Sequence, residues 1–82
     1  MPFRGRASIR YSAGLEPRVK LSVFNSLGQE VKTLVNGPAT SGIHTAVWDG
    51  TDNAGTQVAA GSYFYKLETP KSSQTLRATL LR

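Results

Sequence analysis

The sequence predicts an all-β domain, an antiparallel sandwich of two sheets built from about seven short strands. Three observations lead to this class. Apolar and polar residues alternate with period two in several short runs, no run has a convincing helical period, and turn-forming Gly, Pro, Asn and Asp separate the runs. With 82 residues and no internal repeat, the chain is expected to hold an extended leader over residues 1–6 and one sandwich domain over residues 7–82.

The first two expected strands, residues 7–12 and 18–23, have the clearest alternation of apolar and polar side chains. Gly14 and Pro17 lie between them and indicate a loop, since Pro restricts the residue before it to extended geometry. One face of each strand is apolar, and we expect these faces to be core. The core residues predicted from these strands are Ile9, Tyr11, Val19, Leu21 and Val23.

The next two strands are less regular. Residues 25–28 read as a hairpin turn, and residues 30–35 form a third strand whose mixed apolar spacing indicates a bulge or an edge position. Residues 36–42 are expected to be a connection, because Pro38 cannot donate to a strand ladder. In the fourth strand, residues 43–49, the single Trp has the most apolar area to bury, so Trp48 is placed inward together with His44 and Ala46.

The most informative run of the chain is WDGTDNAGTQVAAGSYFYKL, residues 48–67. It predicts a strand end, a tight turn, a short extended piece near residues 57–59, and an aromatic strand over residues 62–68. The last strand, residues 74–81, follows a turn around Pro70. The predicted structural turn residues are Asp49, Gly50, Asp52, Asn53, Gly55 and Gly61, and the predicted core residues are Trp48, Tyr63, Tyr65, Leu67, Leu76, Ala78 and Leu80.

This run resembles the immunoglobulin-like domain that is shared by flagellar hook-capping proteins and by the C-terminal sorting domains of type IX (Por) secretion cargo. Further stretches with the same resemblance are residues 2–3 (PF), 9–12 (IRYS), 19–31 (VKLSVFNSLGQEV), 42–44 (GIH) and 80–82 (LLR). The resemblance implies an immunoglobulin-like sandwich. It also implies a module appended to secreted cargo, recognised by the secretion machinery and concerned with attachment to the cell surface.

Catalysis and cation binding are not expected from the residue inventory. The chain has one His and no Cys, and no nucleophile motif is present. Asp49, Asp52 and Asn53 could supply hard oxygen ligands, but in an EF-hand register Ala54 replaces the glycine and Ala60 the glutamate that such a loop needs. The sequence therefore predicts no enzyme, no metal, no cofactor and no small-molecule substrate.

The chain has a formal net charge of +5, and its basic residues are mostly scattered along strand faces, with one local cluster at Arg4, Arg6 and Arg10. We expect no nucleic-acid binding, because neither a recognition helix nor interleaved aromatic and basic residues are present. No apolar run approaches the roughly 20 residues that span a bilayer, and no export signal is recognised in this chain. From the resemblance we expect an extracytoplasmic protein, secreted or on the cell surface.

Protein partners are the expected ligands. Phe24 and Phe64 fall on the nominally outward faces of their strands, as an interaction surface or as peripheral core, and Arg77 and Arg82 form the basic end of the last strand. A sandwich also has open edge strands, for which residues 7–12 and 74–81 are the candidates. Two alternatives to a sorting module therefore stay open: a self-assembling subunit of an extracellular filament, and a hook-cap-like assembly chaperone. The oligomeric state is not predicted.

Overall fold

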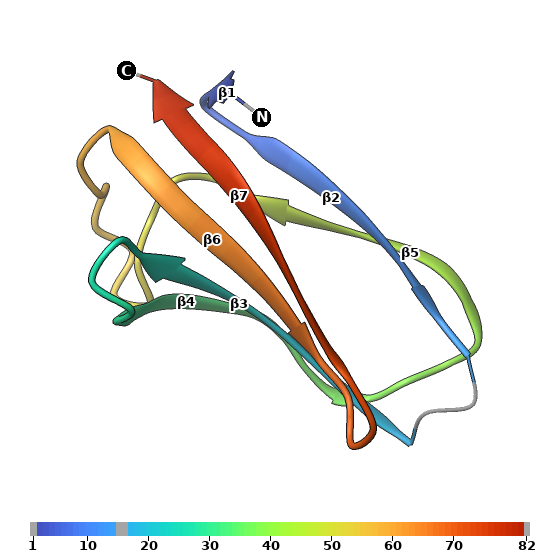
Figure 1. Ribbon diagram of the computed structural model, residues 1–82. Helices are drawn as coiled ribbons and strands as arrows, with labels where there is room; N and C mark the ends of the chain where they lie inside the picture. Colours follow the sequence, from blue (N-terminus) through green and yellow to red (C-terminus); the bar gives the residue numbers. More distant parts are fainter. Residues whose placement is uncertain (1, 15–16, 82) are drawn as a thin grey trace.

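Seven strands account for most of the residues that the computed structural model describes, which are residues 2–14 and 17–81 (Figure 1). They are β1 (Pro2–Arg4), β2 (Ala7–Ala13), β3 (Arg18–Asn25), β4 (Glu30–Pro38), β5 (Gly42–Trp48), β6 (Gly61–Glu68) and β7 (Ser73–Leu81). Within this part of the chain no helix is long and apolar enough to cross a membrane. The all-β prediction is confirmed.

The strands form two sheets of unequal size (Figure 1). The larger has the order β1-β7-β6-β3-β4, and the smaller consists of β2 and β5. All neighbouring pairs are antiparallel except β1 and β7, which run parallel with Phe3 opposite Leu80. The residues expected to form an extended leader thus include a strand, and Phe3 is buried in the core.

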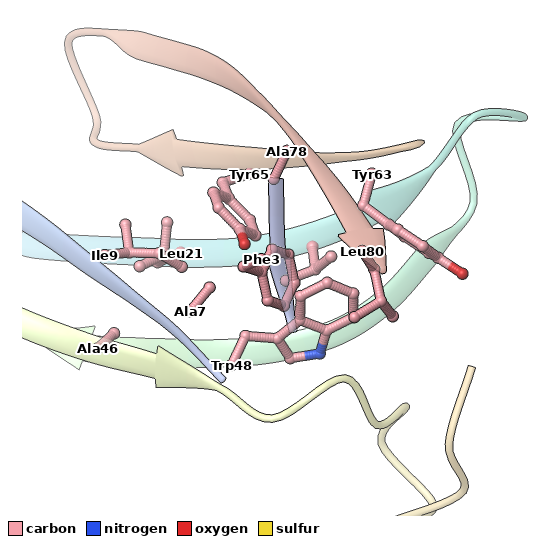
Figure 2. Close-up of a cluster of buried hydrophobic side chains, with 11 residues drawn as sticks. Phe3, Ala7, Ile9, Leu21, Ala46, Trp48, Tyr63, Tyr65, Ala78 and Leu80 are labelled. Atoms are coloured by element: carbon pink, nitrogen blue, oxygen red, sulfur yellow. The ribbon is translucent and has the colours of Figure 1, made fainter. Parts of the chain in front are cut away.

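The core lies between the two sheets and is centred on Trp48, which is fully buried (Figure 2). Its ring packs against Phe3, Tyr63 and Tyr65 with centroid distances of 5.6, 5.0 and 6.1 Å. The inward residues of each strand follow the period-two alternation of the sequence. The structure buries Ile9, Val19, Leu21, Val23, Trp48, Tyr63, Tyr65, Ala78 and Leu80, and it packs the partly buried Tyr11 and Leu67 against this cluster.

The prediction that Leu76 is a core residue is wrong, because 61% of its surface is exposed. The alternation is correct, since Leu76 pairs with Tyr65 on the same face of the sheet as Ala78 and Leu80. The smaller sheet has only two strands, however, and it does not extend over this part of β7. Alternation therefore identifies the inner face of a strand without showing how far the opposite sheet covers it.

Strand β4 is longer than the sequence indicated. Residues 36–38, expected to be part of a connection, continue the strand, and Pro38 pairs with Arg18. Proline is compatible with this place, since it is the last residue of a strand at the edge of the sheet. The pairing of β3 with β4 shifts register between Leu21 and Ser22 and between Val23 and Phe24, which explains the mixed spacing of apolar residues in β4.

Candidate interaction surface

Three outward side chains lie in one row across the larger sheet. Phe24 of β3 pairs with Phe64 of β6, which in turn pairs with Arg77 of β7. Their neighbours Val23 and Tyr65 point into the core, so the row lies on the opposite face of the sheet. Both phenylalanines are half-buried, but neither packs against the core cluster. Interaction surface and peripheral core both stay predictions for these two phenylalanines, and we call Phe24, Phe64 and Arg77 the outer row.

A shallow hollow of about 320 Å³ adjoins the outer row at the turn between β3 and β4. Its lining consists of Phe24, Asn25, Ser26, Gly28, Phe64, Lys66 and Thr75. The turn is held by the side chain of Asn25, whose Oδ1 accepts from the backbone amides of Leu27 and Gln29, both at 3.0 Å. This arrangement leaves Leu27 at the tip of the turn with 82% of its surface exposed. The hollow thus has an apolar wall and a fixed rim.

The charged groups on this face are partly paired. Lys20 Nζ lies 3.2 Å from Glu30 Oε1, and Lys66 Nζ lies 4.0 Å from Glu68 Oε2. Lys20, helped by nearby hydroxyl groups, holds the pKa of Glu30 below its ordinary value. Arg77 Nη2 contacts Ser62 Oγ at 3.4 Å. Arg82, the other basic residue predicted for this surface, lies outside the described residues.

The turn after Trp48 is held by its own carboxylates. Asp49 Oδ1 accepts from the backbone amide and the hydroxyl of Thr51, at 3.2 and 2.5 Å, and the hydroxyl is the main reason that the pKa of Asp49 is lowered. Asp52 Oδ1 accepts from the amides of Ala54 and Thr56, both at 3.0 Å. Gly55 has a positive φ of 84°, which favours glycine at this position. The indole of Trp48 donates to the carbonyl of Thr51 at 2.8 Å and ties the turn to the core.

Asn53 connects the same turn to the free edge of β4. Its backbone amide donates to the carbonyl of Val31 at 3.0 Å, and its side-chain Oδ1 accepts from the backbone amide of Thr33 at 3.1 Å. Lys32 Nζ donates to the carbonyl of Asp52 at 3.1 Å. Asn53 therefore takes the place of a neighbouring strand along part of this edge, a role that sequence spacing does not reveal. Within the described residues, no three His, Asp or Glu side chains are grouped to hold a metal.

His44, the only histidine, belongs to the rim of the smaller sheet. Its ring stacks on Tyr11 with a centroid distance of 5.4 Å, and Nε2 lies 2.7 Å from the carbonyl of Thr40. Nε2 donates in this contact, since a carbonyl can only accept. The predicted inward position of Ala46 and Trp48 is confirmed, with Ile43 and Val47 exposed on the other face of β5.

The two sheets, their Greek-key-like order and the aromatic core define an immunoglobulin-like sandwich module. The model of the FlgD Ig-like domain matches residues 5–73, and the chain therefore belongs to this family. No curated protein matches the chain.

Two solved structures have the same fold. FlgD from P. aeruginosa is 21% identical with a TM-score of 0.68, over 88% of this chain and 58% of that one. PorZ, described as an essential bacterial surface component of the type-IX secretion system of Porphyromonas gingivalis, is 22% identical with a TM-score of 0.61. That match covers 99% of this chain and 11% of PorZ. The chain thus corresponds to only part of each of these proteins.

Proposed function

We propose that this domain is a non-enzymatic binding module of an extracytoplasmic bacterial protein, and that it serves as a sorting and cell-surface attachment domain recognised by secretion machinery. The observation that carries this proposal is the outer row. Its two phenylalanines are paired on the face of the sheet that does not contact the core, so they contribute little to packing between the sheets. The domain in PorZ, a surface component of a secretion system, supports the proposed setting.

The chemistry of the outer row fits a protein partner. Partly buried aromatic side chains beside Arg are among the residue types that contribute most energy at protein interfaces. The adjoining hollow has space for an apolar side chain of a partner, and Lys66 and Arg77 give the surface a basic rim. We therefore expect a partner surface with an apolar anchor and acidic residues around it.

The test is export of a reporter fused to this domain, in a bacterium that has a type IX secretion system. Phe24→Ser combined with Phe64→Ser should abolish the appearance of the reporter at the cell surface. The matched control is Ile43→Ser, which removes an apolar residue that is 67% exposed on the smaller sheet. Purified variants should retain cooperative unfolding, so that a loss of export is not a loss of folding. Normal export of the double variant would contradict the proposal.

A filament subunit is the second candidate, favoured by the open edges of the smaller sheet. Neither β2 nor β5 has a second strand neighbour in the described structure. Such edges can pair with another copy. Light scattering and negative-stain images of the purified domain separate the candidates: a monomer favours the sorting module, whereas regular fibres favour the filament.

A further inference from the structure

A groove lies between β2 of the smaller sheet and β7 of the larger sheet. Figure 1 shows these two strands along the same side of the sandwich. The groove contains two hollows of about 190 and 230 Å³, which share Ile9, Arg10, Tyr65 and Leu76 in their linings. The remaining lining residues are Ser8, Tyr11, Ser12, Leu21, Leu67, Gln74 and Arg77. The two hollows therefore form one continuous site with an apolar floor.

The groove is open to solvent at Leu76. Leu76 is 61% exposed, although Ala78 and Leu80 on the same face of β7 are 0% and 1% exposed. The difference arises because the smaller sheet does not extend over this part of β7, and β1 lies beside β7 only over Thr79–Leu81. Over residues 73–78 no strand of the described structure lies beside β7 on that side, and β2 likewise pairs only with β5. Two strand edges therefore border the groove.

Tyr65, which lines both hollows, carries a polar atom without a partner. Tyr65 is 3% exposed, and its hydroxyl oxygen is buried with no hydrogen-bond partner in the described part of the chain. Burial raises the pKa of this hydroxyl to about 12. The hydroxyl of Tyr63, two residues earlier on the same face of β6, donates to the carbonyl of Ala59 at 2.6 Å. An unpaired buried hydroxyl is costly, and a carbonyl that enters the groove would remove this cost.

The charges that border the groove have one sign. Arg10 of β2 and Arg77 of β7 line it, and no described carboxylate does. An acidic side chain at the rim of the groove would meet these guanidinium groups.

We propose that this groove binds an extended segment of a partner protein, in which apolar residues alternate with acidic ones. The segment adds as a strand along β7 over residues 73–78, in line with β1, and the alternation of a strand directs its apolar side chains into the two hollows. Its acidic residues face Arg10 and Arg77, and a main-chain carbonyl accepts from Tyr65. This inference does not depend on the proposed function, because Arg77 is the one residue that the groove shares with the outer row, and Phe24 and Phe64 do not line the groove.

The test uses a fluorescein-labelled synthetic peptide in which Val and Leu alternate with Asp and Glu, titrated with the domain and followed by fluorescence anisotropy. Saturable binding is expected. A peptide of the same composition in an order without alternation, and an alternating peptide with Lys in place of the acidic residues, should bind at least about tenfold more weakly. Among residues 73–78, amide exchange should slow at those alternate positions whose amides point away from β6 when the acidic alternating peptide is bound, because these amides then donate to its carbonyls.

Single substitutions test whether the peptide binds in the groove. Leu76→Glu places a charge at the exposed side of the groove and should weaken binding at least about tenfold without unfolding the domain. Arg10→Glu should have a similar effect, and Tyr65→Phe should weaken binding while the free domain stays as stable as the wild type. Val47→Glu, an exposed position on the outer face of β5, is the matched control and should bind normally.

Three results would overturn the proposal. One is the absence of saturable binding by the acidic alternating peptide, and another is equal binding by the wild type and Leu76→Glu. The third is a domain that associates with itself in light scattering and becomes monomeric in Leu76→Glu, since the occupant of the groove would then be a second copy. The result of the export experiment with the outer-row variant does not change any of these binding measurements. Each proposal can therefore be refuted without the other.

Discussion

At the scale of single residues, Tyr63 and Tyr65 differ in one hydrogen bond. Both are buried on the inner face of β6, but only Tyr63 has a partner for its hydroxyl. We expect Tyr63→Phe to lower the free energy of unfolding by about 1 kcal/mol, because a formed hydrogen bond is lost. Tyr65→Phe should leave it equal or higher, because a buried unpaired hydroxyl is removed. Urea unfolding measures both values, and a larger loss for Tyr65→Phe would contradict this account.

Trp48 combines packing with a hydrogen bond to the neighbouring turn. Trp48→Phe removes part of the edge-to-face ring contacts and the indole hydrogen bond to the carbonyl of Thr51. We expect a loss of about 2 kcal/mol in the free energy of unfolding, from the cavity and the broken bond together. Val47→Ala, next to it on the outer face, is the control and should change stability by less than about 0.5 kcal/mol. Equal effects in urea unfolding would show that Trp48 is not the centre of the core.

At the scale of elements, the turn that contains Asn53 protects the edge of β4. Asn53→Ala removes the oxygen that accepts from the amide of Thr33. We expect a loss of about 1 kcal/mol in unfolding free energy and faster amide exchange at Thr33, because that amide becomes open to solvent. Gln57→Ala, an exposed position in the same segment, should leave the exchange rate unchanged. Unchanged exchange at Thr33 in Asn53→Ala would exclude the edge role.

Alternation in the sequence predicted the elements whose two faces have different surroundings. Strands β2 and β3 have one face in the core and one outside, and their starts and inward residues follow directly from period two. Their ends at Ala13 and Asn25 lie one and two residues beyond the predicted ones. Strand β4 lies at an edge and its pairing is bulged, so its pattern is mixed and its end at Pro38 is not visible in the sequence. Strand β1 is too short to show a period, and its pairing with β7 joins residues from opposite ends of the chain.

The candidate surfaces were predictable only where they depend on one strand at a time. The outward position of Phe24 and Phe64 follows from alternation, whereas their pairing with each other and with Arg77 depends on the order of β3, β6 and β7. The groove between β2 and β7 and the exposure of Leu76 depend on how far the smaller sheet extends. No spacing within the sequence contains that information.

At the scale of the whole molecule, shifted pKa values predict stability that declines at both ends of the pH range. Asp49 and Glu30 have folded pKa values below their ordinary 3.8 and 4.5, the first mainly through the Thr51 hydroxyl and the second mainly through Lys20. Their contribution is present above those ordinary values and is lost as the pH falls through the lowered ones. Tyr65 has its pKa raised from 10.0 to about 12, so its contribution is present below pH 10.0 and is lost as the pH rises toward about 12.

Urea unfolding as a function of pH tests this profile. The free energy of unfolding should be highest between the acid and alkaline limbs. Glu30→Gln combined with Asp49→Asn should flatten the acid limb, and Tyr65→Phe should reduce the slope of the alkaline limb, because each variant removes the group that titrates there. If the acid limb of the double variant equals that of the wild type, these two carboxylates are not its cause.

The parallel pairing of β1 with β7 also determines how the domain responds to mechanical load. The two strands lie side by side and run in the same direction (Figure 1). Tension applied at residues 2 and 81 in opposite directions would slide one strand along the other, so that the bonds between them bear the force at the same time rather than opening in sequence. Phe3, anchored against Trp48, would have to leave the core in the same event. The short first strand therefore resists mechanical extension of the domain, in addition to extending the sheet.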